Sequence, residues 1–395
     1  MNTNPIRSVL TPLSSAWASF TPLLVLALVL AGAVRIPFVL SADFPLNDGG
    51  LFYVMIRDLE SAGYRLPYTT SYNSAGIPYA YPPFAFYAAG LLHRATGWQL
   101  LDILRLLPSV ISILTIPVVC SLALAITDSR HLASIATVLF SVMPRSMQWL
   151  VMGGGLTRSF GFFFALVALQ CYVLLLRQRR LLYLIGCTIF CALTILSHLE
   201  MAWFLAYSCL LLTITTHRTS GRPAIIASVV IGTLALVFPW LVTVISRHGL
   251  APFIAAARDG ESVTASLLIV MLGYGTAEPL VPIVGSMALV GFVGDLHRKR
   301  MLLPLWLSLM LILDPRGALT TATVPLSILG ASGIQIALSL FQRHNPSRES
   351  QAPEPPGPAW ALRWGNVGTT CAVLALLVYT AGGTILASAS MLQPL

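Results

Sequence analysis

The chain has 395 residues, of which 56% are hydrophobic and only 9% are charged. Soluble domains carry about 25% charged residues, so this composition excludes an ordinary soluble protein. The net charge of +9 comes from short basic clusters between apolar runs, which is typical of orientation in a bilayer rather than of nucleic-acid binding. We therefore expect an all-α, polytopic membrane protein.

The first apolar run covers about residues 20–40 and is long enough to cross a bilayer as a retained helix. A long, more polar first loop follows over residues 41–92. It holds four of the chain's fourteen acidic residues. Within this loop the apolar piece 82–92 is too short to span about 30 Å, which predicts a re-entrant or interfacial helix.

Apolar runs then recur to the end of the chain, and we expect about eleven transmembrane helices in all. After the first, their approximate bounds are 103–126, 132–151, 159–176, 181–196, 201–216, 223–245, 280–294, 301–313, 318–341 and 367–390. Residues 1–341 would form the main transmembrane region and 367–395 the last helix. Between them, the proline-rich segment 342–366 is predicted to be a cytoplasmic linker.

A cytoplasmic N-terminus would place nearly every basic cluster in an inside loop, as the positive-inside rule requires. Several ionisable residues would then share the opposite, extracytoplasmic face: Asp48, Arg145, Arg158, His198, Glu200, Asp314 and Arg316. Charges at the ends of apolar spans are costly unless they face water, a cavity or one another. We expect a shared polar site at the outer face of a bacterial-type plasma (inner) membrane.

Asp48 lies in the sequence Leu46-Asn47-Asp48-Gly49-Gly50, shortly after the first span. The two glycines let the backbone approach a ligand closely, and a carboxylate beside a membrane cavity can act as a general base. Asn47 is a neighbouring candidate for substrate binding. The competing interpretation is a helix cap or an Asx turn, because Asn-Asp-Gly is a common turn sequence.

Arg145 and Arg158 flank a segment without any acidic residue. An arginine without a local carboxylate suits a phosphate or diphosphate, which its planar fork binds through two hydrogen bonds. The glycines at 153–155 add backbone N–H groups at a helix start, which also favours an anion. Either arginine could instead reach out to lipid headgroups.

Arg316 follows Asp314 and Pro315 in the middle of an apolar region. The proline prevents the preceding helix from continuing and fixes the arginine in place, where the cation could stabilise a departing phosphate. Local pairing with Asp314 is the alternative. His198 and Glu200 are two residues apart and do not share a helical face. They could contact a sugar or phosphate, join a metal ion, or form a hydrogen-bonded loop pair.

The tyrosines of the first loop are typical of an aromatic belt at the membrane boundary, although aromatic faces also stack on sugar rings. They include Tyr64, Tyr68, Tyr72, Tyr79 and Tyr81, of which Tyr81 is a candidate substrate contact. The six cysteines lie in apolar runs without metal-ligand spacing. No nucleotide-binding loop, zinc motif or nucleophile triad is evident.

The Asp after the first span, the Tyr-Pro-Pro-Phe sequence at 81–84, the Pro-Arg of the second outer loop and the Ser-His-Leu-Glu turn at 197–200 resemble the GT-C type membrane glycosyltransferases. That superfamily includes protein mannosyltransferases, aminoarabinose transferases and oligosaccharyltransferase catalytic subunits. The resemblance covers roughly residues 20–330 in layout and rests on short motifs and topology. It implies that 1–341 is a GT-C-like catalytic region.

The resemblance implies sugar transfer from a polyprenyl-phosphate donor to a lipid, glycan or protein acceptor, with Asp48 as the base and with Arg158 and Arg316 on the phosphate. Metal-dependent members carry an acidic pair in the second outer loop, whereas residues 144–158 contain none. We therefore expect no required cofactor, with a divalent metal not favoured. The alternatives are a transporter or lipid flippase for an anionic substrate, and a non-catalytic membrane subunit.

Overall fold

The computed structural model describes residues 21–41, 48–152, 155–215, 222–258, 275–278, 281–343 and 378–385. Within these ranges the chain is helical, with no strand and one isolated β-bridge between Thr69 and Pro78. Five helices are long and apolar enough to cross a membrane. The expectation of an all-α, multi-pass membrane protein is confirmed, while the total of about eleven spans stays a prediction.

The five long apolar helices are α2 (Thr21–Leu40), α5 (Leu100–Thr127), α8 (Gly155–Gln178), α11 (Arg222–His248) and α17 (Thr323–Arg343). Shorter apolar helices complete the bundle: α6 (Arg130–Val142), α9 (Leu181–Ile195), α10 (Leu199–Thr215), α14 (Ile283–His297) and α15 (Leu302–Leu313). The remaining helices are α3 (Gly49–Ser61), η1 (Tyr72–Ser74), α4 (Phe84–Thr96), η2 (Pro144–Ser146), α7 (Gln148–Val151), α12 (Ala251–Arg258) and α16 (Pro315–Thr321).

The helices differ in how deeply they lie in the bundle. In its most apolar window, α8 has 72% of its residues buried by other parts of the protein, whereas α11 has only 22%. A helix that is apolar on all sides and yet little buried by protein faces lipid. Helix α8 is therefore central, and α11 lies at the periphery against α9.

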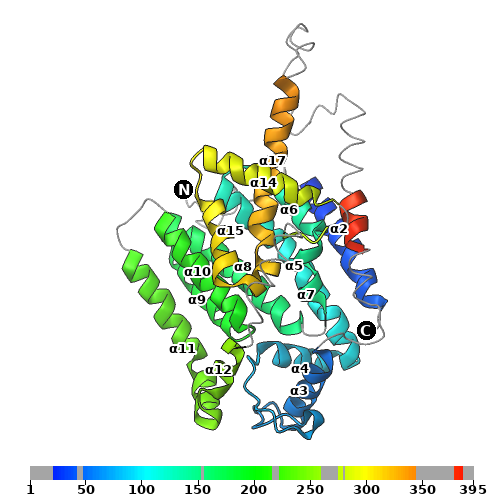
Figure 1. The fold of residues 1–395 in the computed structure, drawn as a ribbon. Helices are drawn as coiled ribbons and strands as arrows, with labels where there is room; N and C mark the ends of the chain where they lie inside the picture. The colour runs from blue at the N-terminus through cyan, green and yellow to red at the C-terminus, as the bar shows by residue number, and fades with distance from the viewer. Residues whose placement is uncertain are drawn as a thin grey trace, which may run out of the picture.

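The first loop folds into a small helical layer below one end of the bundle, where Figure 1 shows α3 and α4 side by side. At 13 residues α4 is too short to cross the membrane, as expected of the piece after Tyr81. Aromatic side chains build the interior of this layer, since the ring of Phe52 packs edge-on against the rings of Tyr81 and Phe86.

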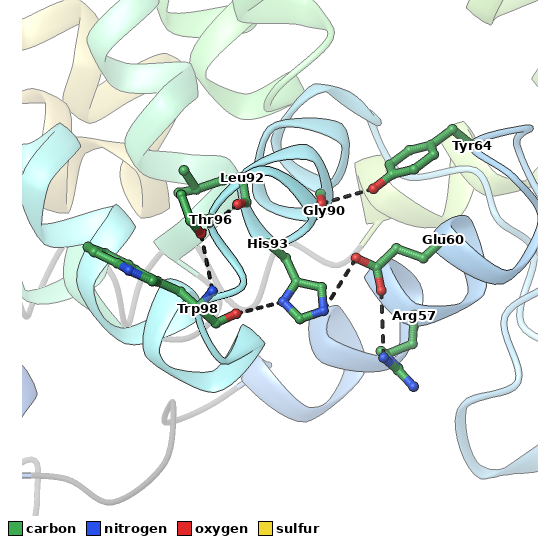
Figure 2. A network of polar contacts seen from close by, with 8 residues as sticks. All are labelled: Arg57, Glu60, Tyr64, Gly90, Leu92, His93, Thr96 and Trp98. Carbon is green, nitrogen blue, oxygen red and sulfur yellow. Dashed lines mark hydrogen bonds and ion pairs between the residues drawn. The ribbon is translucent and has the colours of Figure 1, made fainter.

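Hydrogen bonds hold the same layer together. Figure 2 shows the His93 ring between α3 and the start of α5, with Nδ1 2.6 Å from the Trp98 carbonyl oxygen and Nε2 3.9 Å from Glu60 Oε1. The Tyr64 hydroxyl donates to the Gly90 carbonyl oxygen at 2.9 Å. These contacts hold α4 against α3.

The tyrosines of this loop do not form a uniform aromatic belt. Tyr79 is buried, and its hydroxyl donates to the Met55 carbonyl oxygen at 2.9 Å. Tyr68 is exposed and donates to the Arg247 carbonyl oxygen at the end of α11. The belt interpretation is wrong for Tyr79, because the loop buries that ring in its own core.

The proposed division of the chain after residue 341 stays a prediction. Residues 344–366 lie outside the described ranges, and only 378–385 of the last segment are described, where they are helical.

Candidate functional site

An ion pair between α8 and α10 lies at the centre of the candidate site. Arg158 in the first turn of α8 places Nη2 3.3 Å from Glu200 Oε2 in the first turn of α10. Both side chains are about one-fifth exposed. The two residues are 42 positions apart in the sequence. Arg158 has no acidic neighbour along the chain, and folding brings it the carboxylate of Glu200.

His198 lies next to this pair and is buried. Its Nδ1 is 4.0 Å from Glu200 Oε2. Burial lowers the pKa of the imidazole, and the positive charges of Arg158 and Arg316 lower it further. The ring is therefore neutral near pH 7. The approach of its turn to α8 requires Gly161, because a Cβ there would lie 2.6 Å from His198 Cβ.

The break between α15 and α16 brings Asp314 to the same place. Asp314 caps α16 by accepting a hydrogen bond from the Gly317 N–H at 3.0 Å, while its Oδ2 is buried without a hydrogen-bond partner. Burial and the Glu200 carboxylate raise the pKa of Asp314 to about 6, against the opposing effects of the Gly317 bond, Arg158 and Arg316. Asp314 belongs to the cluster as a carboxyl group that titrates close to neutral pH.

Asp48 approaches the cluster from the first loop. It occupies the N-cap position of α3, but its side chain makes no capping hydrogen bond, so the structure does not support the cap interpretation. The Asp48 and Glu200 carboxylates both raise the pKa of Tyr81, and Arg158 lowers it, although burial is the largest cause of the upward shift. Tyr81 thus lies within electrostatic reach of both halves of the site. Asn47 lies outside the described residues.

The second outer loop covers another side of Arg158. The ring centroid of Trp149, in α7, is 5.9 Å from the Arg158 guanidinium carbon, a distance typical of a cation–π contact. Arg145 lies in η2, which contacts α16, the helix that carries Arg316. Burial lowers the pKa of Arg145.

Three N–H donors of this loop are buried without a hydrogen-bond partner: Arg145 Nε, Trp149 Nε1 and Arg158 Nε. An unsatisfied buried donor costs about 1–3 kcal/mol and is rare in native proteins, where it is explained by water, an ion or a functional role. Donors that cluster beside arginines are suited to an anionic or hydroxyl-rich ligand.

An apolar cavity of about 400 Å³ lies at the junction of the first loop with the helical bundle. It lies between α4, the end of α9 and the peripheral helix α11. Its lining is Leu66, Pro83, Phe84, Tyr87, Leu196, Leu236, Pro239, Trp240 and Thr243. The Phe84 N–H donates to the Leu196 carbonyl oxygen at 2.9 Å. Four of the lining residues belong to the lipid-facing helix α11, and none belongs to the polar cluster.

In the described ranges, no group of three or more His, Cys, Asp or Glu side chains is arranged to hold a metal ion. His198 and Arg158 both approach the Oε2 atom of Glu200. Metal independence stays a prediction.

Seven of the eight site residues expected from the sequence are described. Glu200, His198, Arg316, Tyr81 and Asp48 lie within electrostatic reach of Arg158 or of one another, whereas Arg145 lies in η2 against α16. The sequence placed Asp314 on the same outer face as the other charges but gave it no separate role in substrate binding. It did not identify Trp149 as the ring beside Arg158. No sequence signal indicated Trp149, because its contact with Arg158 depends on the turn that leads into α8.

No protein-family model matches the sequence, and no curated protein matches it. Solved structures do match. The archaeal oligosaccharyltransferase AglB from Archaeoglobus fulgidus, in complex with an inhibitory peptide and a dolichol-phosphate, matches with a TM-score of 0.61 and 15% identity. The match covers 94% of this chain and 55% of AglB, so the chain spans just over half of the length of that protein.

Two further structures extend this finding. ArnT from Cupriavidus metallidurans, bound to undecaprenyl phosphate, matches with a TM-score of 0.56 and 15% identity over 92% of this chain and 75% of ArnT. The Archaeoglobus enzyme in complex with Zn and sulfate matches with a TM-score of 0.56 and 15% identity over 92% of this chain and 53% of its own. AglB and ArnT are both GT-C superfamily members. The resemblance read from the sequence is confirmed for the fold.

The first prediction concerns the titration of Asp314. Its folded pKa of about 6 lies above the ordinary aspartate value of 3.8, so the folded state binds more protons between these two pH values and loses stability as pH rises through them. Asp314→Asn keeps an oxygen for the Gly317 N–H and has no charge. We expect the melting temperature of Asp314→Asn, relative to that of the wild type, to increase as the pH is raised from 4.5 to 8.

The measurement is thermal unfolding in detergent at several pH values. Asp314→Ala serves as the matched variant, because it removes both the charge and the cap. Its melting temperature should lie below that of Asp314→Asn by a margin that does not change with pH. A difference between wild type and Asp314→Asn that stays constant from pH 4.5 to pH 8 would contradict the assignment.

Proposed function

We propose that the protein is a membrane glycosyltransferase that moves a sugar from a polyprenyl-phosphate-linked donor to an acceptor at the extracytoplasmic face. The observation that carries the proposal is the donor-rich cluster around Arg158, set within a GT-C fold. The matching structures of AglB and ArnT contain dolichol-phosphate and undecaprenyl phosphate, which supports a donor of the same chemical class.

Arg158 is suited to the donor phosphate. Glu200 takes up one of its nitrogens at 3.3 Å, whereas its Nε is buried without a partner. A guanidinium has five N–H donors, so the ion pair orients the side chain and leaves donors for a second anion. Arg316 and Arg145 add positive charge nearby. We assign these cations to the charge that develops on the phosphate as the sugar leaves.

Asp48 is suited to the acceptor. Its carboxylate is exposed and not committed to a helix cap. An acceptor hydroxyl would attack the anomeric carbon of the sugar while the bond from that carbon to the phosphate oxygen breaks. The hydroxyl proton passes to Asp48, and the electron pair leaves with the lipid phosphate. This single displacement inverts the anomeric centre.

His198, Glu200 and Tyr81 complete the binding site in this proposal. The neutral His198 ring can both donate and accept a hydrogen bond, which suits the hydroxyl groups of a sugar. Tyr81 lies between the Asp48 and Arg158 sides, where its hydroxyl and ring can contact the transferred sugar. Asn47 is proposed to bind substrate next to Asp48. The proposal assigns the phosphate charge to arginines, so a divalent cation is not required.

The alternative of a transporter or flippase would place charged groups along a path through the bilayer. Arg35 lies within α2, but it is fully buried and commits its nitrogens to three hydrogen bonds. The charges that remain available gather at helix starts and loops. This arrangement favours a site at one membrane face.

The second prediction tests the proposed base. Asp48→Asn keeps the size of the side chain and removes the proton acceptor, so we expect sugar transfer to fall by about 10²-fold or more. The assay uses sealed right-side-out vesicles with EDTA present, a polyprenyl-phosphate sugar as donor, and acceptor added outside. Asp128→Asn is the control, because Asp128 pairs with Arg177 away from the cluster.

Turnover that is unchanged in Asp48→Asn would reject the base assignment. Transfer that requires added divalent metal would reject the metal-free mechanism, and transfer only in inverted vesicles would reject the orientation.

The third prediction locates the hydrocarbon part of the donor in the apolar cavity. A polyprenyl phosphate with a photoreactive group near its phosphate end should label α4 or α11, and mass spectrometry of digested protein identifies the site. Leu236→Trp fills the cavity and should suppress that labelling, whereas Ile231→Trp, on the exposed face of α11, should not. Labelling confined to other helices would contradict this location.

A further inference from the structure

Arg35 is the only charged residue of α2, and its side chain is fully buried. A buried charge costs several kcal/mol unless hydrogen bonds compensate for the lost water. Arg35 makes three such bonds, all to neutral oxygens. Its Nε donates to Ser112 Oγ at 3.0 Å, its Nη1 to the Ser141 carbonyl oxygen at 2.7 Å and its Nη2 to Ser146 Oγ at 3.0 Å.

Two of these three acceptors lie on either side of the break that ends α6. In a continuing helix the Ser141 carbonyl oxygen would accept from the Arg145 N–H, four residues on. Pro144 follows the end of α6, and the Arg145 N–H donates instead to the Thr276 carbonyl oxygen at 3.4 Å. The Ser141 oxygen therefore needs another donor, and Arg35 provides it.

The Ser146 hydroxyl links the other side of the break. It accepts from Arg35 and donates to the Met143 carbonyl oxygen at 2.7 Å. The Val142 carbonyl oxygen accepts from the Thr384 hydroxyl. Side chains thus satisfy three consecutive carbonyls at the end of α6, and the single guanidinium of Arg35 bonds on both sides of the turn.

The turn fixed in this way carries the second outer loop. Arg145 lies within η2, and α7 follows directly with Trp149, whose ring lies 5.9 Å from the Arg158 guanidinium. Met147 and Val151 pack in one apolar cluster with residues of α2 that flank Arg35. The direction in which Arg145 and Trp149 point therefore depends on how η2 is attached to α2.

We propose that Arg35 is a positioning residue, which holds η2 and α7 so that Trp149 lies against the Arg158 guanidinium and Arg145 stays beside α16. The inference rests on the proposed function for its kinetic consequence, because only a phosphate-binding role for this loop connects Arg35 to the donor. The structural part stands by itself: the guanidinium donates to the Ser141 carbonyl oxygen, which lacks its helical partner because of the break at Pro144, and it also bonds Ser146 Oγ beyond the break.

The structural part is tested without any activity assay. Hydrogen exchange is followed in the full chain in nanodiscs for Arg35→Met, Arg35→Lys and Ser112→Ala. We expect faster exchange over residues 143–151, most in Arg35→Met and less in the other two, with α14 and α17 unchanged. Ser109→Ala is the matched control on α5, because the Ser109 hydroxyl is buried without a hydrogen-bond partner, and its exchange should equal that of the wild type.

The kinetic part separates donor from acceptor. Arg35→Lys is expected to raise the KM for a polyprenyl-phosphate sugar by about tenfold and to leave the acceptor KM unchanged. In the double variant, Arg35→Lys should raise the donor KM by less than about twofold beyond Arg145→Gln alone. The effects of two residues that act through one another are not additive. A general loss of folding would instead lower the active fraction and leave both KM values unchanged.

The outcomes distinguish the inference from the proposed function. Unchanged exchange over 143–151 in both Arg35 variants would overturn the positioning role. Additive effects of Arg35→Lys and Arg145→Gln would overturn it as well. If the Arg35 variants exchange faster over 143–151 but the wild-type protein transfers no sugar, the proposed function is rejected and the structural role of Arg35 stands.

Discussion

The ion pair between Arg158 and Glu200 is the contact on which the site depends. A bilayer offers no water to a charge at a helix end, so such a charge must meet a partner, a ligand or a cavity. Glu200 meets one nitrogen of Arg158, and His198, Asp314 and Trp149 surround the pair. The starts of α8 and α10 and the α15–α16 break are thereby brought to one point.

Two loops contribute further residues to the site. The first loop is held by hydrogen bonds from tyrosine hydroxyls and by the His93 contacts, and it presents Asp48 and Tyr81. The second loop is anchored on α2 through Arg35 and presents Arg145 and Trp149. In the proposed reaction the first loop serves the acceptor and the second serves the donor phosphate. Rigid placement is what such a reaction needs, since the reacting atoms must approach within about 3–3.5 Å.

Local pattern predicted the spans and the polar face, because apolar length and charge asymmetry are properties of the sequence alone. The long helices α5, α8 and α11 begin and end within a few residues of the expected bounds. Contacts between residues that are distant in the sequence could not be predicted from local pattern. The acid-free segment around Arg158 suggested an arginine without a carboxylate, whereas Glu200 reaches it from another helix. Burial of Tyr79 and the role of Arg35 likewise depend on tertiary contacts.

The central claim is that the Arg158 cluster binds the phosphate of a polyprenyl lipid. Native mass spectrometry of the purified protein tests it most directly, with Arg158→Gln compared with Arg177→Gln, which alters an exposed arginine on the opposite end of α8. The account predicts a co-purifying polyprenyl phosphate or phospho-sugar in the wild type and in Arg177→Gln, and its loss in Arg158→Gln. Only ordinary phospholipids, retained equally by all three proteins, would contradict it.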